Sequence, residues 1–355
     1  MISSGTNAGV LRRFGTAVVA TAALLVGGTA LSTGAQAETW RFALEEIEGS
    51  VQDMYAQKFK ELVEQRTDGD VTVQVYPYGA LGTSQDLTEL TANGSLQFTF
   101  ASPGHLATMV PEMGVFNLPY ILSQNNEVNK QVLTEGDVVY NDLAPALKDK
   151  NLKLVTMFPE GEMVWTANKA IRSPEDMAGF KMRVMTSPIL TEAYRSMGAS
   201  PTPMPYGEVY GGLQLGQIDG QVNPIFAIEE MKFYEVQDYM IFAGQQQFTT
   251  SVVANQTFYQ GLPDERRAML DEVTTELVDY IFKVQDQYAE ERLAKIKEAK
   301  PDIEVIELSE EERAAFRERA MSARDTFVEM TGDSGKEVLQ ALQSEITETE
   351  QAVTD

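Results

Sequence analysis

Short apolar runs separated by amphipathic segments recur along most of the chain and predict alternating strands and helices. Near the start, residues 40–44 form an apolar run with strand character. Apolar residues then repeat at helical spacing across residues 51–63, and valines alternate with polar residues across residues 71–75. A strand, a helix and a second strand in this order indicate an α/β unit with parallel strands.

The clearest run of this pattern lies between Gly179 and Phe226. We expect strands at residues 180–185 and 217–225, with a short apolar segment between them. Helices are expected at residues 189–197, after a proline and before a glycine, and at residues 208–215. The carboxyl ends of parallel strands meet at one edge of a sheet, where ligands bind in open α/β folds.

The remaining segments extend the same architecture. A helix is expected across residues 125–147, followed by a strand at residues 153–157. A helix of about 35 residues, more than about 50 Å long, is expected after Pro263. Its apolar positions lack sustained heptads, so they do not support a coiled coil.

The first 37 residues have the pattern of a secretion signal. Arg12 and Arg13 form a basic start, residues 14–31 are apolar, and Ala35-Gln36-Ala37 supplies small residues for cleavage after Ala37. General export is favoured over twin-arginine export, because the residues around the arginine pair lack most of that motif. We therefore expect a soluble, periplasmic protein.

Composition excludes several classes of function. The formal net charge is −25 and the acidic residues are spread along the chain, which argues against nucleic acid or an anionic membrane as partner and suits a high-salt environment. Cysteine is absent and His105 is the one histidine, so multi-histidine metal sites are excluded. No nucleophile elbow or phosphate loop is present, and no cofactor is expected.

Polar and aromatic residues at the predicted strand ends are the candidate site. Arg183, Tyr206 and Asn223 fall at or just beyond strand ends. An arginine in an apolar strand can pair with a carboxylate of its own protein or receive a ligand carboxylate in two hydrogen bonds. His105 follows another strand end, where it either lines a pocket or faces solvent.

The 179–226 stretch resembles the signature of the DctP-type solute-binding proteins of TRAP transporters. The residues that carry the resemblance are RVMTSPILTEAYRSMGASPTPMPYGEVYGGLQLGQIDGQVNPI. It implies an α/β periplasmic-binding-protein (clamshell) fold with two lobes and a long helix bracing both. The implied domains are residues 1–37 as signal peptide, 38–161 as the first part of lobe I, 162–247 as the first part of lobe II, and 248–355 as the return to lobe I with the long helix and the C-terminal helices shared between the lobes.

Two further segments resemble the ectoine- and hydroxyectoine-binding branch of that family, namely WRFALEEIEG and FPEGEMVWTANKAIRSPED. By this resemblance Arg183 binds a ligand carboxylate and Glu46 meets a cationic group. The sequence departs from the branch at three aromatic positions, where it has His105, Tyr206 and Ala227. The complete set of ligand-binding residues implied is Glu46, His105, Arg183, Tyr206, Asn223, Phe226 and Phe248.

Alternative functions stay open at this point. The ligand is an ectoine-like zwitterion, or a plain organic acid, sugar acid or small amine. The protein is expected to be a monomer that serves a TRAP membrane permease, or else a sensing module with the same fold. An exported glycosidase would need paired carboxylates, but Glu45 and Glu46 are adjacent and on a strand would point to opposite faces. Protonation of His105 near Glu46 is expected to weaken zwitterion binding at low pH.

Overall fold

The computed structural model describes residues 37–354, so all but the last residue of the predicted signal peptide lies outside the described part. A mixed sheet of ten strands runs through this part, in the order β2-β1-β3-β9-β4-β7-β5-β6, with β8 pairing both β4 and β10. The strands are β1 (Glu38–Ala43), β2 (Val71–Tyr76), β3 (Phe98–Ala101), β4 (Leu152–Ala167), β5 (Met182–Val184), β6 (Thr202–Pro203), β7 (Gly220–Pro224), β8 (Tyr239–Phe242), β9 (Gln247–Asn255) and β10 (Glu304–Glu307).

The first half of the sheet is built from β1, β2 and β3. Strand β1 lies between the other two and is parallel to both. Helix α1 (Val51–Arg66) connects β1 to β2, and helix α2 (Ser84–Ala92) connects β2 to β3. Phe42, Phe98 and Phe100 of the strands pack with Phe59 of α1 in one buried aromatic cluster. The predicted strand–helix–strand unit is therefore confirmed.

The second half is built from β5, β6 and β7. Strand β5 lies between β6 and β7 and is parallel to both. Helix α6 (Pro188–Ser196) and helix α7 (Val209–Gln214) connect these strands, as expected, with a short 3-10 turn, η4 (Tyr206–Glu208), before α7. Both sets of three parallel strands thus present their carboxyl ends, and the residues just after them, at an edge of the sheet.

Two long strands, β4 and β9, connect the halves. The first part of β4, from Leu152 to Glu162, pairs antiparallel with β9. Its last part, from Met163 to Ala167, pairs with β7 on one side and in part with β8 on the other. The register between β4 and β9 shifts between Pro159 and Gly161, so Glu160 is the extra residue of a β-bulge.

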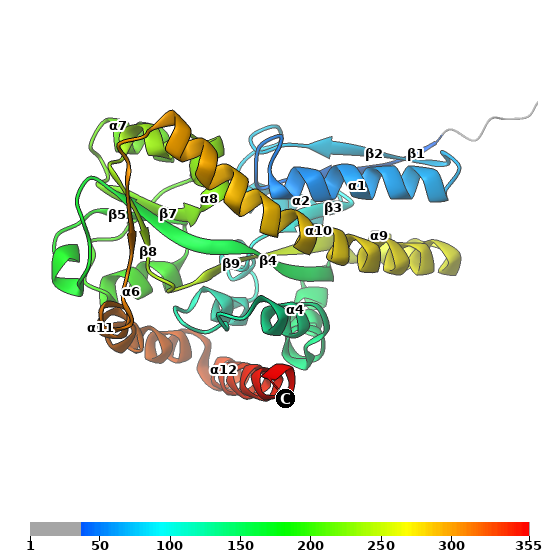
Figure 1. The fold of residues 1–355 in the computed structure, drawn as a ribbon. Helices are drawn as coiled ribbons and strands as arrows, with labels where there is room; N and C mark the ends of the chain where they lie inside the picture. The colour runs from blue at the N-terminus through cyan, green and yellow to red at the C-terminus, as the bar shows by residue number, and fades with distance from the viewer. Residues whose placement is uncertain (1–36, 355) are drawn as a thin grey trace, which may run out of the picture. The chain divides into compact units, whose positions relative to one another are not determined.

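A long helix braces both halves, as predicted. Helix α10 (Asp264–Ala299) has 36 residues and crosses the molecule diagonally in Figure 1, packing on α1 and on α8 (Ile225–Glu230). Arg292 of α10 donates to the Gly49 carbonyl at 3.1 Å and lies 3.2 Å from Glu230 Oε1. One side chain of the helix therefore contacts the loop after β1 and the helix after β7.

The single helix expected across residues 125–147 is wrong. The chain forms α4 (Asn126–Glu135), a π-helical segment η2 (Val138–Leu143) and α5 (Ala144–Asp149). Gly136 has an extended conformation (ψ 141°) that ends α4. The Glu345 carboxylate of α12 (Ser322–Thr354) then accepts from the backbone N–H groups of Asp137 and Val138, at 2.7 and 3.2 Å, and caps the next segment.

The other elements cover the remaining surface of the described chain. In Figure 1, α11 and α12 pass below the sheet, on the side opposite to α10, and α12 ends the chain. The bounds not yet given are α3 (Pro103–Leu106), η1 (Pro111–Asn117), η3 (Pro174–Met177), η5 (Phe233–Val236), α9 (Gln256–Gly261) and α11 (Glu310–Ala320). No helix within residues 37–354 combines the length and the apolar character that crossing a bilayer requires.

Candidate functional site

A cavity of about 240 Å³ lies between the strand ends of the two halves. This volume is below the range of drug-sized ligand pockets and suits a small solute. The residues that line it are Glu45, Glu46, Tyr78, Thr83, Ser84, Gln85, His105, Arg183, Met185, Thr186, Met204, Pro205, Tyr206, Asn223, Pro224, Ala227 and Phe248.

Glu45 and Glu46 both reach the cavity, which corrects the expectation that they point to opposite faces. Strand β1 ends at Ala43, and both glutamates occupy the bend before α1 rather than the pleated strand. The bend is held in place by backbone contacts: Tyr78 N–H donates to the Glu46 carbonyl at 2.8 Å, and Glu45 N–H donates to Gln52 Oε1 at 2.9 Å.

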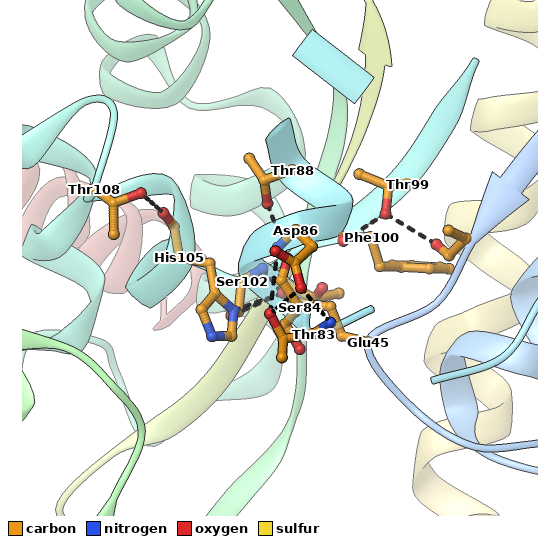
Figure 2. Close-up of polar contacts among 12 residues, drawn as sticks. Glu45, Thr83, Ser84, Asp86, Thr88, Thr99, Phe100, Ser102, His105 and Thr108 are labelled. Carbon is orange, nitrogen blue, oxygen red and sulfur yellow. Dashed lines mark hydrogen bonds and ion pairs between the residues drawn. The ribbon is translucent and has the colours of Figure 1, made fainter. Parts of the chain in front are cut away.

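Glu45 is committed to protein partners. Its Oε2 accepts from the Ser102 N–H at 2.8 Å, and its Oε1 lies 2.6 Å from His105 Nδ1 (Figure 2). The Ser102 hydroxyl lies 2.9 Å from the same ring nitrogen. With Nδ1 facing Glu45, the His105 ring has Nε2 for other partners, and the histidine contributes a polar wall to the cavity.

Glu46 is buried, and no cation of the described residues pairs with it. Its side chain belongs to a residue only 5 % exposed, and Oε2 has no hydrogen-bond partner among the described residues. Burial raises the pKa of Glu46 well above its ordinary value, and the neighbouring Glu160 and Glu230 carboxyl groups raise it further. A cationic ligand group placed here would supply the missing charge partner.

Arg183 enters the cavity from β5 with part of its guanidinium unused. The residue is 2 % exposed, and Nε and Nη2 donate to the Met204 carbonyl at 3.0 and 2.8 Å. Nη1 is buried and has no partner among residues 37–354. Burial lowers the pKa of Arg183 to about 10, so the group remains charged at neutral pH. Nη1 and the remaining N–H of Nη2 can therefore donate hydrogen bonds to the two oxygens of a carboxylate.

Tyr206 and Asn223 supply neutral polar groups on the same side as Arg183. The Tyr206 hydroxyl is buried without a partner among the described residues. Burial and the charges of Glu46 and Glu230 raise its pKa well above the ordinary value, so the hydroxyl stays protonated and can donate. Asn223 is 7 % exposed and donates to Gln221 Oε1, leaving its second amide proton and its carbonyl oxygen.

Tyr78 closes one side of the cavity and was missed by the sequence reasoning. Its ring packs edge-on against Tyr206, with centroids 5.6 Å apart, and its hydroxyl accepts from the Gly207 N–H at 3.2 Å. Tyr78 follows β2 and Gly207 follows β6, so this contact joins the two halves across the site. The available signal was its place just after a predicted strand.

We expect Tyr78→Phe to weaken ligand binding modestly while the aromatic packing stays. The substitution leaves Gly207 N–H without its acceptor, and a typical hydrogen bond contributes about 0.5–1.5 kcal/mol. Gly207 is exposed, so the lower end of that range is expected. Calorimetric titration of the variant measures the loss. Tyr210→Phe, which removes a hydroxyl donating to Glu235 on the surface at 3.0 Å, is the matched control, and an equal loss there would contradict the role of Tyr78.

The structure brings together most of the residues predicted for the site. Glu46, His105, Arg183, Tyr206, Asn223 and Phe248 all line the cavity. Phe226 does not: it is 4 % exposed and packs in the first-half hydrophobic cluster with residues of α1 and α10. The reason is that α8 begins at Ile225, so the helix turns Phe226 into the core and places Ala227 on the cavity wall.

Within residues 37–354, no group of three or more histidine, aspartate or glutamate side chains is arranged to hold a metal ion. Of the two glutamates that line the cavity, Glu45 lies against His105, and burial raises the pKa of Glu46.

Comparison with known proteins agrees with this geometry. The chain is 42% identical over 329 residues to the ectoine/5-hydroxyectoine-binding periplasmic protein UehA of Ruegeria pomeroyi, covering 92% of this chain and 96% of UehA. It is 43% identical over 325 residues to the ectoine-binding periplasmic protein TeaA of Halomonas elongata, covering 91% of this chain and 94% of TeaA.

Solved structures show the same fold. The structure of the periplasmic ectoine-binding protein from the TeaABC TRAP transporter of Halomonas elongata superposes with a TM-score of 0.84 at 42% identity, covering 87% of this chain and 99% of that one. Such relatives are solute-binding subunits of transporters rather than enzymes. The family model of bacterial extracellular solute-binding proteins, family 7 (DctP), matches residues 42–330. This chain therefore belongs to the DctP family and is a periplasmic, two-lobed solute-binding protein of a TRAP transporter.

Proposed function

We propose that this protein captures a small zwitterion of the ectoine type between its lobes and delivers it to the TRAP membrane subunits. The ligand carboxylate binds Arg183, with Asn223 and Tyr206 as neutral partners. The cationic part of the ligand faces Glu46. Tyr206 and Phe248 supply aromatic walls for the ring, and a delocalised cation gains from contact with such faces.

One observation carries this proposal. Two buried atoms at the cavity have no hydrogen-bond partner within the described part of the chain: the guanidinium nitrogen Arg183 Nη1 and the carboxylate oxygen Glu46 Oε2, which come from opposite halves of the sheet. An unpaired buried charge is costly, so each group needs a partner of the other sign. A ligand that carries both charges satisfies both groups at once.

A plain organic acid or sugar acid is the second candidate. His105 and Ala227 stand where the ectoine-binding branch has aromatic residues, and both line the cavity. The wall is therefore more polar at one position and less bulky at another, which favours a hydroxylated ligand. Such an acid would satisfy Arg183 but leave Glu46 facing an uncharged or negative group.

The two proposed lobes correspond to the two halves of the sheet. Lobe I contains residues 38–161 and lobe II residues 162–247, and residues 248–355 return to lobe I and supply the long helix and the shared C-terminal helices. Within the sheet of the described residues, β4 and β9 are the strands that connect the halves, so closure is a hinge motion about these strands. A ligand that touches both lobes binds the closed form better and shifts the population toward it.

The proposed mature protein is exported and monomeric. Residues 1–37 are removed as a signal peptide, with cleavage after Ala37. The mature protein acts as a monomer, since one chain supplies both sides of the cavity.

A solute panel tests the ligand assignment. The purified mature protein is titrated with ectoine, 5-hydroxyectoine, a C4-dicarboxylate, a sugar acid and a small amine, using thermal shift and then calorimetry. We expect the two zwitterions to raise the melting temperature most, because binding to the native state stabilises it by mass action. A large shift with the sugar acid or dicarboxylate and none with either zwitterion would refute the proposed ligand.

A further inference from the structure

Glu160 is a buried acidic residue just behind the cavity. It is 3 % exposed and does not line the cavity itself. It is the extra residue of the bulge in β4, and the following Gly161 has a φ of +124°, a conformation that L-residues rarely adopt. Bulges of this kind re-aim a side chain and are common next to functional sites. The backbone is therefore built to turn Glu160 out of the strand alternation.

The Glu160 side chain is held next to Glu46. Gln52 Nε2 lies 3.4 Å from Glu160 Oε2 and 3.5 Å from Thr250 Oγ1, while Gln52 Oε1 accepts from Glu45 N–H. Gln52 therefore joins the Glu160 carboxyl to the bend that carries Glu45 and Glu46. Glu160 raises the pKa of Glu46, and a hydrogen bond from Glu46 acts to lower the pKa of Glu160. Glu46 Oε2 and Glu160 Oε1 both lack a donor among the described residues. A hydrogen bond between two carboxyl groups requires a proton on one of them.

The nearby cationic groups in the described part of the chain have other partners. His105 of α3 is paired with Glu45, and Arg292 of α10 contacts Glu229 and Glu230 of α8. Arg183 of β5 donates to the Met204 carbonyl from the other lobe.

No ion pair joins Glu46 or Glu160 to a lysine, arginine or histidine among the ion pairs of residues 37–354. Burial is the largest cause that raises the pKa of both carboxyl groups. Glu230 adds to both, with Glu160 acting on Glu46 and Glu45 acting on Glu160.

We propose that Glu160 is a positioning residue for the ligand site. Glu160 shares a proton with Glu46 and orients the Glu46 carboxylate, so binding of a cationic group competes with proton uptake by the pair. This rests on the proposed zwitterionic ligand. With one shared proton the Glu46–Glu160 pair carries a negative charge, which a cationic ligand group favours. A second proton makes the pair neutral and removes that attraction. Affinity for the zwitterion therefore rises with pH, by up to about tenfold per pH unit where one proton is displaced.

The test is calorimetric titration with ectoine between pH 5 and pH 8, in buffers of different ionisation enthalpy that report proton release. The wild type should bind more tightly as pH rises and release protons on binding. Glu160→Gln keeps a hydrogen-bond donor to Glu46, so it should bind at pH 8 within about threefold of wild type, since the donor is retained, with little pH dependence. Glu160→Met, of similar size but without a donor, should bind more weakly at every pH.

Two control variants separate this pair from its neighbours. His105→Phe removes the histidine whose protonation was predicted from the sequence to weaken zwitterion binding at low pH. Glu230→Gln removes the carboxyl group of Glu230 on α8. Both should keep the wild-type dependence of affinity on pH, whatever their absolute affinity. The proposal would be overturned if the affinity of Glu160→Gln depended on pH as steeply as that of the wild type, or if the affinity of His105→Phe did not depend on pH.

The shared proton can also be detected without ligand. In the Glu230→Gln background, the infrared spectrum of the free protein at neutral pH should contain a carboxylic-acid C=O band that Glu160→Gln or Glu46→Gln removes. The absence of this band in that background would overturn the proposal even if a Glu160 variant fails to fold. If the band is present and ectoine does not bind at any pH, the carboxyl pair is supported and the proposed ligand is refuted.

Discussion

Arg183→Ala is expected to weaken binding of a carboxylate ligand by about 2–5 kcal/mol, the range for removing one partner of a buried charge pair. Arg183 is 2 % exposed, and its Nη1 has no partner among the described residues. The substitution removes this donor and leaves the ligand carboxylate buried without a cation. Calorimetric titration with the best solute of the panel measures the effect.

Two further variants show whether the loss is specific. Arg183→Lys keeps a positive charge but cannot hold the Met204 carbonyl and two ligand oxygens together, so it should bind with intermediate affinity. Arg195→Ala removes an exposed arginine of α6, 58 % accessible, and should bind like the wild type. Wild-type affinity in Arg183→Ala would show that the carboxylate binds elsewhere.

Glu46→Gln is expected to weaken zwitterion binding by about 1.5–3 kcal/mol, because a charge-assisted hydrogen bond becomes a neutral one. The carboxylate is buried and its Oε2 lacks a partner among residues 37–354. For a plain acid, the same change removes a like charge from the cavity, so affinity should stay the same or improve. The sign of the change therefore distinguishes the two candidate ligand classes.

The neighbouring glutamate is the control for this measurement. Glu45 also lines the cavity, but its two oxygens face Ser102 N–H and His105 Nδ1. Glu45→Gln should disturb the position of His105 more than the charge available to the ligand, and its effect should be smaller than that of Glu46→Gln. Tighter ectoine binding by Glu46→Gln would rule out the zwitterion assignment.

The sequence was sufficient to predict the parts of the site that follow strand ends. Period-two alternation and helical spacing are local properties, and parallel strands bring their carboxyl ends to one edge. Arg183, Asn223 and His105 follow from that rule, and the resemblance supplied Glu46. All four line the cavity. The long helix after Pro263 was predicted for a similar reason, since its pattern runs uninterrupted through 36 residues.

Features that depend on distant segments could not be predicted. Glu160 is aimed by a bulge whose register is set by β9, about ninety residues further along the chain. Tyr78 acquires its role from Gly207 on the opposite half. The break after α4 is stabilised by Glu345 near the end of the chain. In each case the deciding partner is a long-range contact, which local propensity does not contain.

Glu45 and Phe226 show a different limit, the position of an element boundary. Ending β1 at Ala43 instead of one or two residues later turns both Glu45 and Glu46 toward the cavity. Starting α8 at Ile225 turns Phe226 into the core and exposes Ala227 to the cavity. Periodicity in a sequence locates the ends of helices and strands only to within one or two residues, and here one residue decides which side chain lines the cavity.

The two crossing strands have a consequence for how the protein melts. Strand β4 belongs to both halves: Leu152 to Glu162 pairs with β9, and Met163 to Ala167 pairs with β7. If the second half unfolded alone, β4 would lose its partners within one continuous strand and the buried residues on both of its parts would be exposed. We therefore expect the halves to unfold cooperatively, in one transition, even with the proposed hinge motion between them. A solute held at their junction protects the whole chain from thermal denaturation, and not just the lobe that grips it more strongly.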